Sequence, residues 1–350
     1  MNEEPTVILD ESHGLGRIML NRPKALNSLD LGMVEAIAPR LAAWAVDPAI
    51  GAVLIEGAGD RAFCAGGDIR ALYDNRGGDF GARFYGTEYR LNIAIADFPK
   101  PYVALMDGVT MGGGVGLSVH GSHRIATERT LFAMPETGIG FFPDVGGGWF
   151  LARCPGALGM FLGLTGYRMR AADCLAAGVC DANIPSNRLD AFVEELGHCD
   201  DKSAAAIDMI IADFAEPPDE PETLAPHRTA IDRIFAADSV EGIVAGLEAA
   251  DNDWARDTLA LLATKAPLAL KVTHRLIREG RSQTRFADHM AMEFRLASHF
   301  YAGDTLFEGV RAVIVDKDHK PVWRPGDLAS VSEAEVAAYF EPVAGAPDFG

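Results

Sequence analysis

The chain has 350 residues, of which 49% are hydrophobic, and it carries a formal net charge of −19 at pH 7. That hydrophobic content is typical of a globular protein with a sizeable core, and it excludes a disordered chain. The acidic balance excludes a nucleic-acid or anionic-membrane surface, because both need a basic face. Any site for an anionic ligand must therefore be a local basic patch.

The N-terminal sequence MNEEPTVILDES is acidic and lacks the basic region and the apolar run of a signal peptide. No apolar stretch reaches the roughly 18 residues of a membrane helix. The five cysteines form no CxxC pair, and their odd number argues against a disulfide framework. We therefore expect a cytoplasmic protein with reduced thiols and with no nucleic-acid or membrane partner.

The first third of the chain alternates short apolar runs, glycine-rich loops and helical patterns. In chain order we expect strands at 6–9 and 16–20, a helix at 30–45, a strand at 52–57, a helix after Asp68, a helix at 84–96 and a strand at 101–108. Asp30 is the candidate N-cap of the first helix. The polar, glycine-rich run 74–81 is predicted to be a mobile surface loop. The repeated order of strand, glycine cluster and helix favours an α/β architecture with crossover connections.

The sequence after Gly148 is mainly helical in pattern. From about residue 188 to the end, predicted helices are separated by loops that contain proline or glycine, and 217–226 (PPDEPETLAP) is the clearest linker. We therefore divide the chain into an α/β core at 1–187, which holds the active site, and a mainly helical C-terminal region at 188–350.

Two glycine clusters follow two of the predicted strands. They are Cys64-Ala65-Gly66-Gly67-Asp68 and Met111-Gly112-Gly113-Gly114-Val115-Gly116. Glycine lets another group approach the backbone closely, and a helix that opens after such a turn leaves N–H groups free. Two such N–H groups can bind one oxygen as negative charge develops on it, with roughly 3–4 kcal/mol of stabilisation per donor. The alternative is that both clusters are only tight turns. A dinucleotide loop is disfavoured, since Leu117 stands where the third glycine of GxGxxG would fall.

Two carboxylates, Glu136 and Asp144, each follow a proline in apolar surroundings. Apolar neighbours would desolvate a carboxyl group and raise its pKa toward a value useful in catalysis. One acid could then serve as nucleophile or base and the other as its partner acid. The alternative for each is a residue at the start of a helix near a solvent-exposed face.

For three other features a structural role is favoured from the residues alone. Cys64 has no histidine near it in sequence, so a small buried residue is the expected role. His120 and His123 resemble a metal-binding pair but lack an evident third ligand, so no metal site is expected. Glu88, in TEYRLN, reads as part of a solvated helix face.

A basic stripe recurs on one helix face near residue 275. Its members are Lys271, His274, Arg275 and Arg278. We expect a solvated stripe, and a phosphate site is the alternative, because basic residues are concentrated here on an otherwise acidic chain.

The segments AFCAGGDI, MGGGVGLSVHG, FAMPETGIGFFPDVGGG and LTGYRM resemble the crotonase (enoyl-CoA hydratase/isomerase) superfamily. The likeness runs from NRPKALNSLD to EGVRAVIVDKDHKPVWRP, which is most of the chain. Its most specific parts, FPDVGGG and EGVRAVIVDKD, are similar to the 3-hydroxyisobutyryl-CoA hydrolase group. The resemblance implies an α/β fold that is a crotonase-like spiral of β-β-α units followed by a helical C-terminal region.

The same resemblance implies roles for individual residues. The N–H groups of Gly67 and Gly113 would form the oxyanion hole, Glu136 would be the catalytic glutamate and Asp144 the catalytic aspartate. The residues implied in substrate binding are Glu88 in the acyl pocket, Ala65, Gly66 and Gly112 beside the oxyanion hole, and Arg22 and Lys24 at the nucleotide end of coenzyme A.

One departure from the superfamily pattern bears on the reaction. Hydratases of the superfamily carry two glutamates for adding water. The first of these glutamates lies two residues past the glycine triplet, and this chain has Gly116 at that place. The resemblance therefore implies hydrolysis of a short 3-hydroxyacyl-CoA thioester, with 3-hydroxyisobutyryl-CoA of valine catabolism as the expected substrate. The alternatives are an enoyl-CoA hydratase/isomerase and a non-catalytic acyl-CoA-binding protein. No cofactor is expected, since coenzyme A is part of the substrate, and the expected assembly is a trimer-based homo-oligomer.

Overall fold

The computed structural model describes residues 5–350, which divide into two compact units that interleave along the chain. Unit 1 comprises the residues up to Gly67, Arg90–Phe132 and Arg168–Thr223. Unit 2 comprises Asp68–Tyr89, Ala133–Tyr167 and Leu224–Gly350. The boundary predicted near residue 187 lies within the last segment of unit 1. No helix within residues 5–350 is both long enough and apolar enough to span a membrane.

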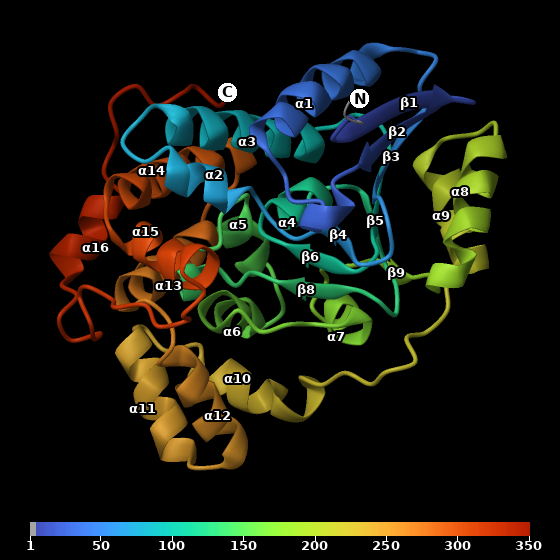
Figure 1. Cartoon of the computed structure of the whole chain (residues 1–350). Helices are drawn as coiled ribbons and strands as arrows, with labels where there is room; N and C mark the ends of the chain where they lie inside the picture. Colours follow the sequence, from blue (N-terminus) through green and yellow to red (C-terminus); the bar gives the residue numbers. More distant parts are fainter. Residues whose placement is uncertain (1–4) are drawn as a thin grey trace. The chain divides into compact units, whose positions relative to one another are not determined.

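Unit 1 contains the strands of the protein and the helices that cover them (Figure 1). Its strands are β1 (Val7–Ser12), β2 (Leu15–Leu20), β3 (Ala52–Gly57), β4 (Ala62–Cys64), β5 (Tyr102–Met106), β6 (Val109–Met111), β7 (His123–Ala126), β8 (Leu131–Ala133, which ends at the unit boundary) and β9 (Ala182–Asn183). Its helices are η1 (Pro23–Ala25), α1 (Leu31–Val46), α4 (Gly113–Ser118), α7 (Ala171–Ala176), η3 (Ser186–Arg188), α8 (Leu189–His198) and α9 (Ala204–Phe214).

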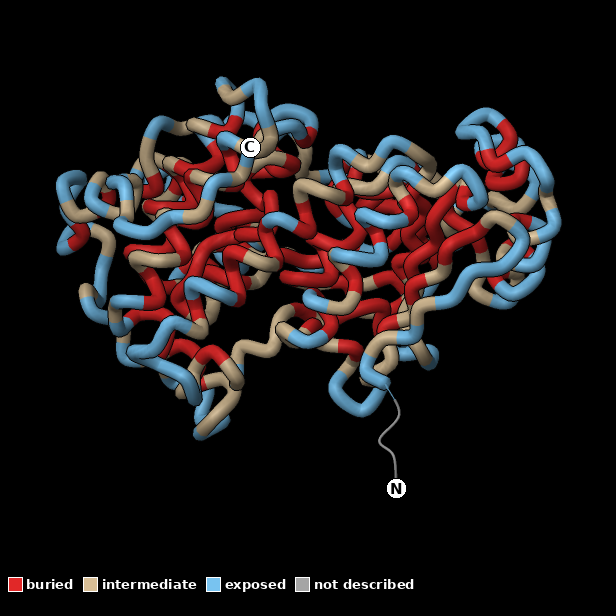
Figure 2. Tube along the Cα trace, turned by 90° about the horizontal axis from the view of Figure 1, so that it is seen from above, coloured by how far each residue is buried: buried red, intermediate tan, exposed pale blue. Residues whose placement is uncertain are grey.

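The strands form a six-stranded sheet, in the order β1-β2-β3-β5-β7-β9, and a smaller sheet in the order β4-β6-β8. In the larger sheet β1 pairs with β2 in antiparallel fashion, and every later pairing is parallel. The parallel strands are joined by crossover segments that include helices, as the alternation in the sequence predicts. Figure 2 shows that the buried residues lie in the interior of the trace, whereas the exposed ones lie on its outer segments.

One face of the larger sheet is covered by α8 and α9. Alternate residues of the inner strands point to this face, because successive side chains of a strand lie on opposite sides. Together with the apolar faces of both helices they form one buried cluster: Leu15, Ala52, Leu54, Val103, Leu105, Ile125, Ile184, Leu189, Phe192, Leu196, Ile207, Ile210 and Ile211. Burial of this size stabilises the sheet by roughly 1.5–3 kcal/mol per large side chain.

Helix α1 packs against β1 and β2. The Asp30 side chain accepts a hydrogen bond from the Met33 N–H (2.8 Å), so the predicted N-cap is confirmed. The buried Trp44 lies against Gly16, where a Cβ atom would come within 2.8 Å of the indole ring. Its Nε1–H donates to Glu11 (2.7 Å), which satisfies the one polar atom that the ring buries.

Unit 2 is almost entirely helical (Figure 1). Its helices are α2 (Ile69–Asp74), the first part of α3 (Phe80–Ala96, which continues into unit 1), η2 (Glu136–Ile139), α5 (Gly147–Leu151), α6 (Leu158–Thr165), η4 (Ala225–His227), α10 (Arg228–Ile234), α11 (Val240–Ala250), α12 (Asp253–Leu262), α13 (Pro267–Gly280), α14 (Phe286–Ala302), α15 (Thr305–Val310), the π-helical turn η5 (Arg311–Val315) and α16 (Glu333–Tyr339). The helical C-terminal region predicted from the sequence is confirmed.

Helix α3 begins earlier than predicted, at Phe80, so the predicted loop 74–81 contains its first two residues. The Phe80 and Phe84 rings stack with their centroids 6.1 Å apart. Gly81 lies so close to Tyr301 that a Cβ atom would come within 2.6 Å of the ring. These tertiary contacts stabilise helix in a stretch whose glycines locally favour a loop.

Candidate active site

The first glycine cluster, Ala65-Gly66-Gly67, is held in place by the loop at residues 26–29. The Ala65 N–H donates to the Leu26 carbonyl (3.0 Å), and the Gly66 carbonyl accepts from the Leu29 N–H (2.8 Å). Gly66 has a φ angle of +120°, a conformation that side chains disfavour. The backbone at Gly66 and Gly67 is therefore fixed by main-chain bonds on its flank.

The second cluster, around Gly112, lies directly beside the first. A Cβ atom at Gly66 would lie 3.6 Å from the Met111 carbonyl oxygen, and one at Gly114 would lie only 2.2 Å from the Cys64 carbonyl oxygen. The Gly114 position thus leaves no room for a side chain. Sequence reasoning predicted two glycine loops at the ends of strands, and the structure brings these two loops together within unit 1.

Each loop presents a backbone N–H group. Gly113 is the first residue of α4, so its N–H has no acceptor within the helix. The contact between Leu29 and Gly67 uses the Gly66 carbonyl, and the Gly67 N–H donates to no group within residues 5–350. Two donors of this kind match the expected composition of an oxyanion hole.

Arg22 directly precedes the short helix η1, Lys24 lies within it, and the two side chains differ in their environment. The Arg22 guanidinium is half-buried, donates to the Ser28 carbonyl (2.6 Å) and lies 3.5 Å from the Asp30 carboxylate. Lys24 is exposed in the same turn. Arg22 therefore has a structural role in this loop, and Lys24 is the more available cation for an anionic ligand.

The carboxylates lie in unit 2, and Glu136 is the first residue of η2. This turn is pinned from two sides. The Thr137 hydroxyl donates to the Leu164 carbonyl (3.1 Å), and the Thr137 carbonyl accepts from the Ala266 N–H (3.1 Å). The Glu136 side chain is 6% exposed, and its Oε2 atom is buried without a hydrogen-bond partner within residues 5–350. A buried carboxyl oxygen that lacks a donor is costly, so it marks a functional position.

Asp144 lies on the turn that opens α5, and its Oδ2 atom accepts a hydrogen bond from the Tyr89 hydroxyl (2.9 Å). Aromatic side chains exclude water from this region. The Phe141 and Phe142 rings lie 4.5 Å apart, and Tyr85 stacks on Phe141 at 5.7 Å. The apolar surroundings predicted for both acids are confirmed by the burial of these residues.

Glu88 is also buried, and its Oε1 atom has no hydrogen-bond partner within the described chain. The solvated helix face expected from its local sequence is wrong. The role implied by the family resemblance, in which Glu88 lies in the pocket, agrees with this burial. The charge of Asp144 acts on the same carboxyl group and adds to the effect of its burial.

Burial and mutual repulsion raise the pKa values of all three acids. Burial is the largest cause for each. The charge of Asp144 further raises the pKa of Glu88 and of Glu136, and the pKa of Asp144 itself is raised to about 8 by burial and by Glu293. The Tyr89 hydrogen bond opposes that rise because it stabilises the ionised form. The cluster therefore holds protons at neutral pH.

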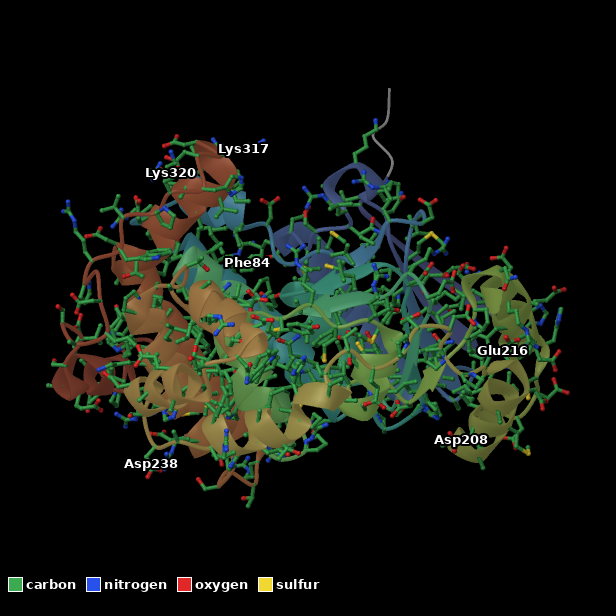
Figure 3. The ribbon with its side chains drawn as sticks, turned by 90° about the horizontal axis from the view of Figure 1, so that it is seen from below. Phe84, Asp208, Glu216, Asp238, Lys317 and Lys320 are labelled. Atoms are coloured by element: carbon green, nitrogen blue, oxygen red, sulfur yellow. The ribbon has the colours of Figure 1, made fainter. Side chains whose placement is uncertain are left out.

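For Cys64 and the basic stripe, the structure agrees with the structural role that the residues favour. Cys64 is fully buried, as predicted. No group of three histidine, cysteine, aspartate or glutamate side chains that could hold a metal ion occurs among residues 5–350. In the basic stripe of α13, Lys271 pairs with Glu241 (2.6 Å) and Arg278 pairs with Asp238 (2.5 Å). Figure 3 labels Asp238 at the surface. Acids of the protein itself thus neutralise the stripe.

Sequence reasoning missed two residues that act directly on Asp144. Tyr89 adjoins Glu88 in TEYRLN, and its hydroxyl could have been proposed as a partner for a buried acid. Glu293, on α14, is fully buried and is one of the causes of the raised pKa of Asp144. The only local signal for Glu293 is its i, i+4 spacing from His289 in HMAMEF.

A family model described as enoyl-CoA hydratase/isomerase matches residues 15–340. The chain belongs to the enoyl-CoA hydratase/isomerase family. Curated relatives include two proteins named "3-hydroxyisobutyryl-CoA hydrolase, mitochondrial". The one from Xenopus tropicalis is 44% identical over 95% of this chain and 88% of its own length. The one from Homo sapiens is 42% identical over 96% of this chain and 88% of its own length.

Two solved structures of this family share the fold. One, titled as a carnitinyl-CoA dehydratase from Mycobacterium thermoresistibile, is 42% identical, covers 98% of both chains and gives a TM-score of 0.92. The other, titled as an enoyl-CoA hydratase from Rhodobacter sphaeroides, is 41% identical, covers 97% of this chain and 98% of its own, and gives a TM-score of 0.87. The crotonase-like fold class predicted from the sequence is confirmed.

The raised pKa of Asp144 predicts a pH-dependent effect of Asp144→Asn on stability. Folding favours the protonated carboxyl, so this group's contribution to stability is fully present below the unfolded pKa near 3.8 and is lost as pH rises through about 8. Asparagine keeps a hydrogen-bond acceptor for Tyr89 but does not ionise. At pH 9 we expect the variant to melt roughly 3–6 °C above the parent protein, with a smaller difference at pH 5.

Thermal unfolding followed by circular dichroism checks this result. The control is Asp257→Asn, which removes an exposed carboxyl of α12 and should leave the melting temperature within about 1 °C at both pH values. A variant that is destabilised equally at pH 5 and pH 9 would contradict a buried, proton-holding Asp144.

Proposed function

We propose that the chain hydrolyses the thioester bond of 3-hydroxyisobutyryl-CoA and releases 3-hydroxyisobutyrate and free coenzyme A. The observation that carries the proposal is a second buried carboxyl, Asp144, that acts on Glu136 from the turn before α5. At Gly116, where hydratases of the superfamily would place a second acid, there is none. The names of the curated relatives support the same reaction.

In this proposal the backbone N–H groups of Gly67 and Gly113 bind the thioester carbonyl oxygen. They polarise the carbonyl group and stabilise the negative charge that forms when its carbon is attacked. Loss of one such donor typically costs about 3 kcal/mol of transition-state stabilisation. Ala65, Gly66 and Gly112 keep the backbone open at this point, because no large side chain blocks the approach of the substrate.

Glu136 is the proposed nucleophile. Its buried carboxyl oxygen lacks a donor, and an anion that is not solvated attacks more readily. The carboxylate attacks the carbonyl carbon, the carbon–sulfur bond breaks, and the coenzyme A sulfur takes a proton from Asp144. The product of this step is a mixed anhydride between Glu136 and the acyl group.

Water completes the reaction. It opens the anhydride, gives one proton back to Asp144 and leaves Glu136 ionised, so that one thioester and one water yield one acid and one thiol. No electrons are transferred, and the proposal includes no cofactor beyond the coenzyme A of the substrate. In the alternative mechanism Glu136 acts as a base toward water that attacks the thioester directly.

Substrate recognition is proposed for three further side chains. Glu88 faces the acyl pocket, where its protonated carboxyl can donate to the hydroxyl group of a 3-hydroxyacyl chain. Lys24, together with Arg22, is proposed to bind the phosphates of coenzyme A.

We also propose a trimer-based homo-oligomer and a cytoplasmic location, although the curated relatives are named as mitochondrial proteins.

The main rival is a hydratase or isomerase, which the titles of the two solved structures favour. Purified protein should release free thiol from 3-hydroxyisobutyryl-CoA, and Glu136→Gln should lower kcat by at least about a hundredfold because it removes the nucleophile. Thiol release is followed by the absorbance that develops when a disulfide reagent reacts with the free thiol of coenzyme A.

The matched control is Glu248→Gln on the exposed face of α11, which should keep full activity. Loss of crotonyl-CoA absorbance without thiol release would point to hydration instead. Measurable acyl-CoA binding with no turnover across a panel of thioesters would indicate a binding protein. Full activity of Glu136→Gln would refute the assigned site.

The anhydride has its own test, a single turnover in water enriched in heavy oxygen. Water that opens the anhydride at the glutamyl carbon leaves heavy oxygen in the Glu136 side chain, which peptide mass spectrometry detects. We expect label in the peptide that contains Glu136. Label found only in the acid product would exclude attack of water on the glutamyl carbon.

A further inference from the structure

Glu293 and His289 form a buried polar pair on α14 that the proposed reaction does not use. Neither side chain has exposed surface, and His289 Nε2 lies 2.9 Å from Glu293 Oε1. The other ring nitrogen of His289 contacts Gln283 Oε1, so the ring is held from both sides. Burying such a pair costs free energy that apolar side chains would not cost, so its presence suggests a specific role.

The Glu293 carboxyl binds the turn that carries Asp144. Its Oε2 atom accepts from the Gly146 N–H (2.7 Å), and its Oε1 atom accepts from the Gly148 N–H (3.1 Å). Two backbone donors thus converge on the carboxyl group, and His289 Nε2 lies beside its Oε1 atom. Gly148 also lies against the pair, since a Cβ atom there would come within 2.8 Å of His289 Nε2.

The bound turn is strained. Val145 has a φ angle of +54°, which is rare for a β-branched residue, and Gly146 follows at +82°. Such a conformation costs roughly 1–3 kcal/mol and persists only when the surroundings impose it. Asp144 directly precedes Val145, and the two N–H groups that Glu293 binds follow it at Gly146 and Gly148. The bonds to Glu293 therefore hold the backbone that aims the Asp144 carboxyl.

The charged and titratable groups around Asp144 come from three elements. They are Tyr85, Glu88 and Tyr89 on α3, Glu136 on η2, and His289 and Glu293 on α14, whereas α6 carries none and the cations of α13 pair elsewhere. After burial, Glu293 is the largest cause of the raised pKa of Asp144. Glu293 thus acts on Asp144 both through the backbone and through space.

We propose that Glu293, braced by His289, is a positioning residue for the reaction, which fixes the strained turn and thereby the direction and protonation of the Asp144 carboxyl. Glu293 itself need not touch the substrate, because its bonds go to the backbone of the turn. The kinetic part of this inference rests on the proposed hydrolysis. The effect on the titration of Asp144 does not.

Glu293→Gln tests the proposal because it removes the charge and replaces one acceptor by an amide donor. We expect kcat for thiol release to fall by about tenfold to a hundredfold, with KM changed by less than about threefold. The titration midpoint of Asp144, followed by carboxyl-carbon NMR and assigned with Asp144→Asn, should move to lower pH by about one unit.

Two further variants separate the possible causes. Asp173→Asn removes a buried acid of unit 1 that bonds Thr223, and it should leave both kcat and the Asp144 midpoint unchanged. Glu293→Asp keeps the charge but shortens the reach to the turn, so kcat should fall while the Asp144 midpoint stays near that of the parent. If Glu293→Gln does not fold, Glu293→Asp carries the test.

An Asp144 midpoint unchanged in Glu293→Gln, or parent-level kcat in Glu293→Gln or Glu293→Asp, would overturn the proposal. A parent protein that releases no thiol would refute the proposed function instead. In that case the NMR titration still decides whether Glu293 controls Asp144.

Discussion

The burial of carboxyl groups with too few hydrogen-bond donors is the constraint on which the rest of unit 2 depends. Glu88 and Glu136 each bury an oxygen that has no partner within residues 5–350, and Asp144 has Tyr89 as its hydroxyl donor. A fold selected for stability alone would replace such groups by apolar ones. Their raised pKa values follow directly from this burial. The burial of these carboxyl groups thus lowers the stability of the protein and also gives the groups their capacity for proton transfer.

The remainder of unit 2 holds these acids in place by bonds to backbone atoms. Leu164 and Ala266 fix the turn of Glu136, and Glu293 fixes the turn of Asp144. In unit 1 the same principle applies to the glycine loops, where main-chain bonds from residues 26–29 fix Gly66 and Gly67. In both units the functional groups lie on short turns, and the precision of those turns comes from distant segments of the chain.

Features encoded by neighbouring residues were predictable from the sequence. The glycine clusters at strand ends, the apolar neighbours of Glu136 and the N-cap at Asp30 are of this kind. The contribution of Glu293 was not, because it lies 147 residues from Gly146 along the chain. The conformation of Val145 was not predictable either, since valine alone disfavours positive φ and only tertiary bonds impose it. The burial of Glu88 likewise depends on contacts that its amphipathic helix does not reveal.

The most direct test of the buried acid cluster is the pH dependence of kcat/KM for thiol release from 3-hydroxyisobutyryl-CoA. Attack by Glu136 needs one ionised carboxyl in a cluster that holds its protons at neutral pH, and coupled acids of this kind titrate as a unit. The mechanism predicts that kcat/KM falls to half of its maximum near pH 8, where Asp144 loses the proton that it gives to the coenzyme A sulfur. A profile that is already flat from pH 5 to pH 9, as expected for acids with roughly ordinary pKa values near 4, would contradict it.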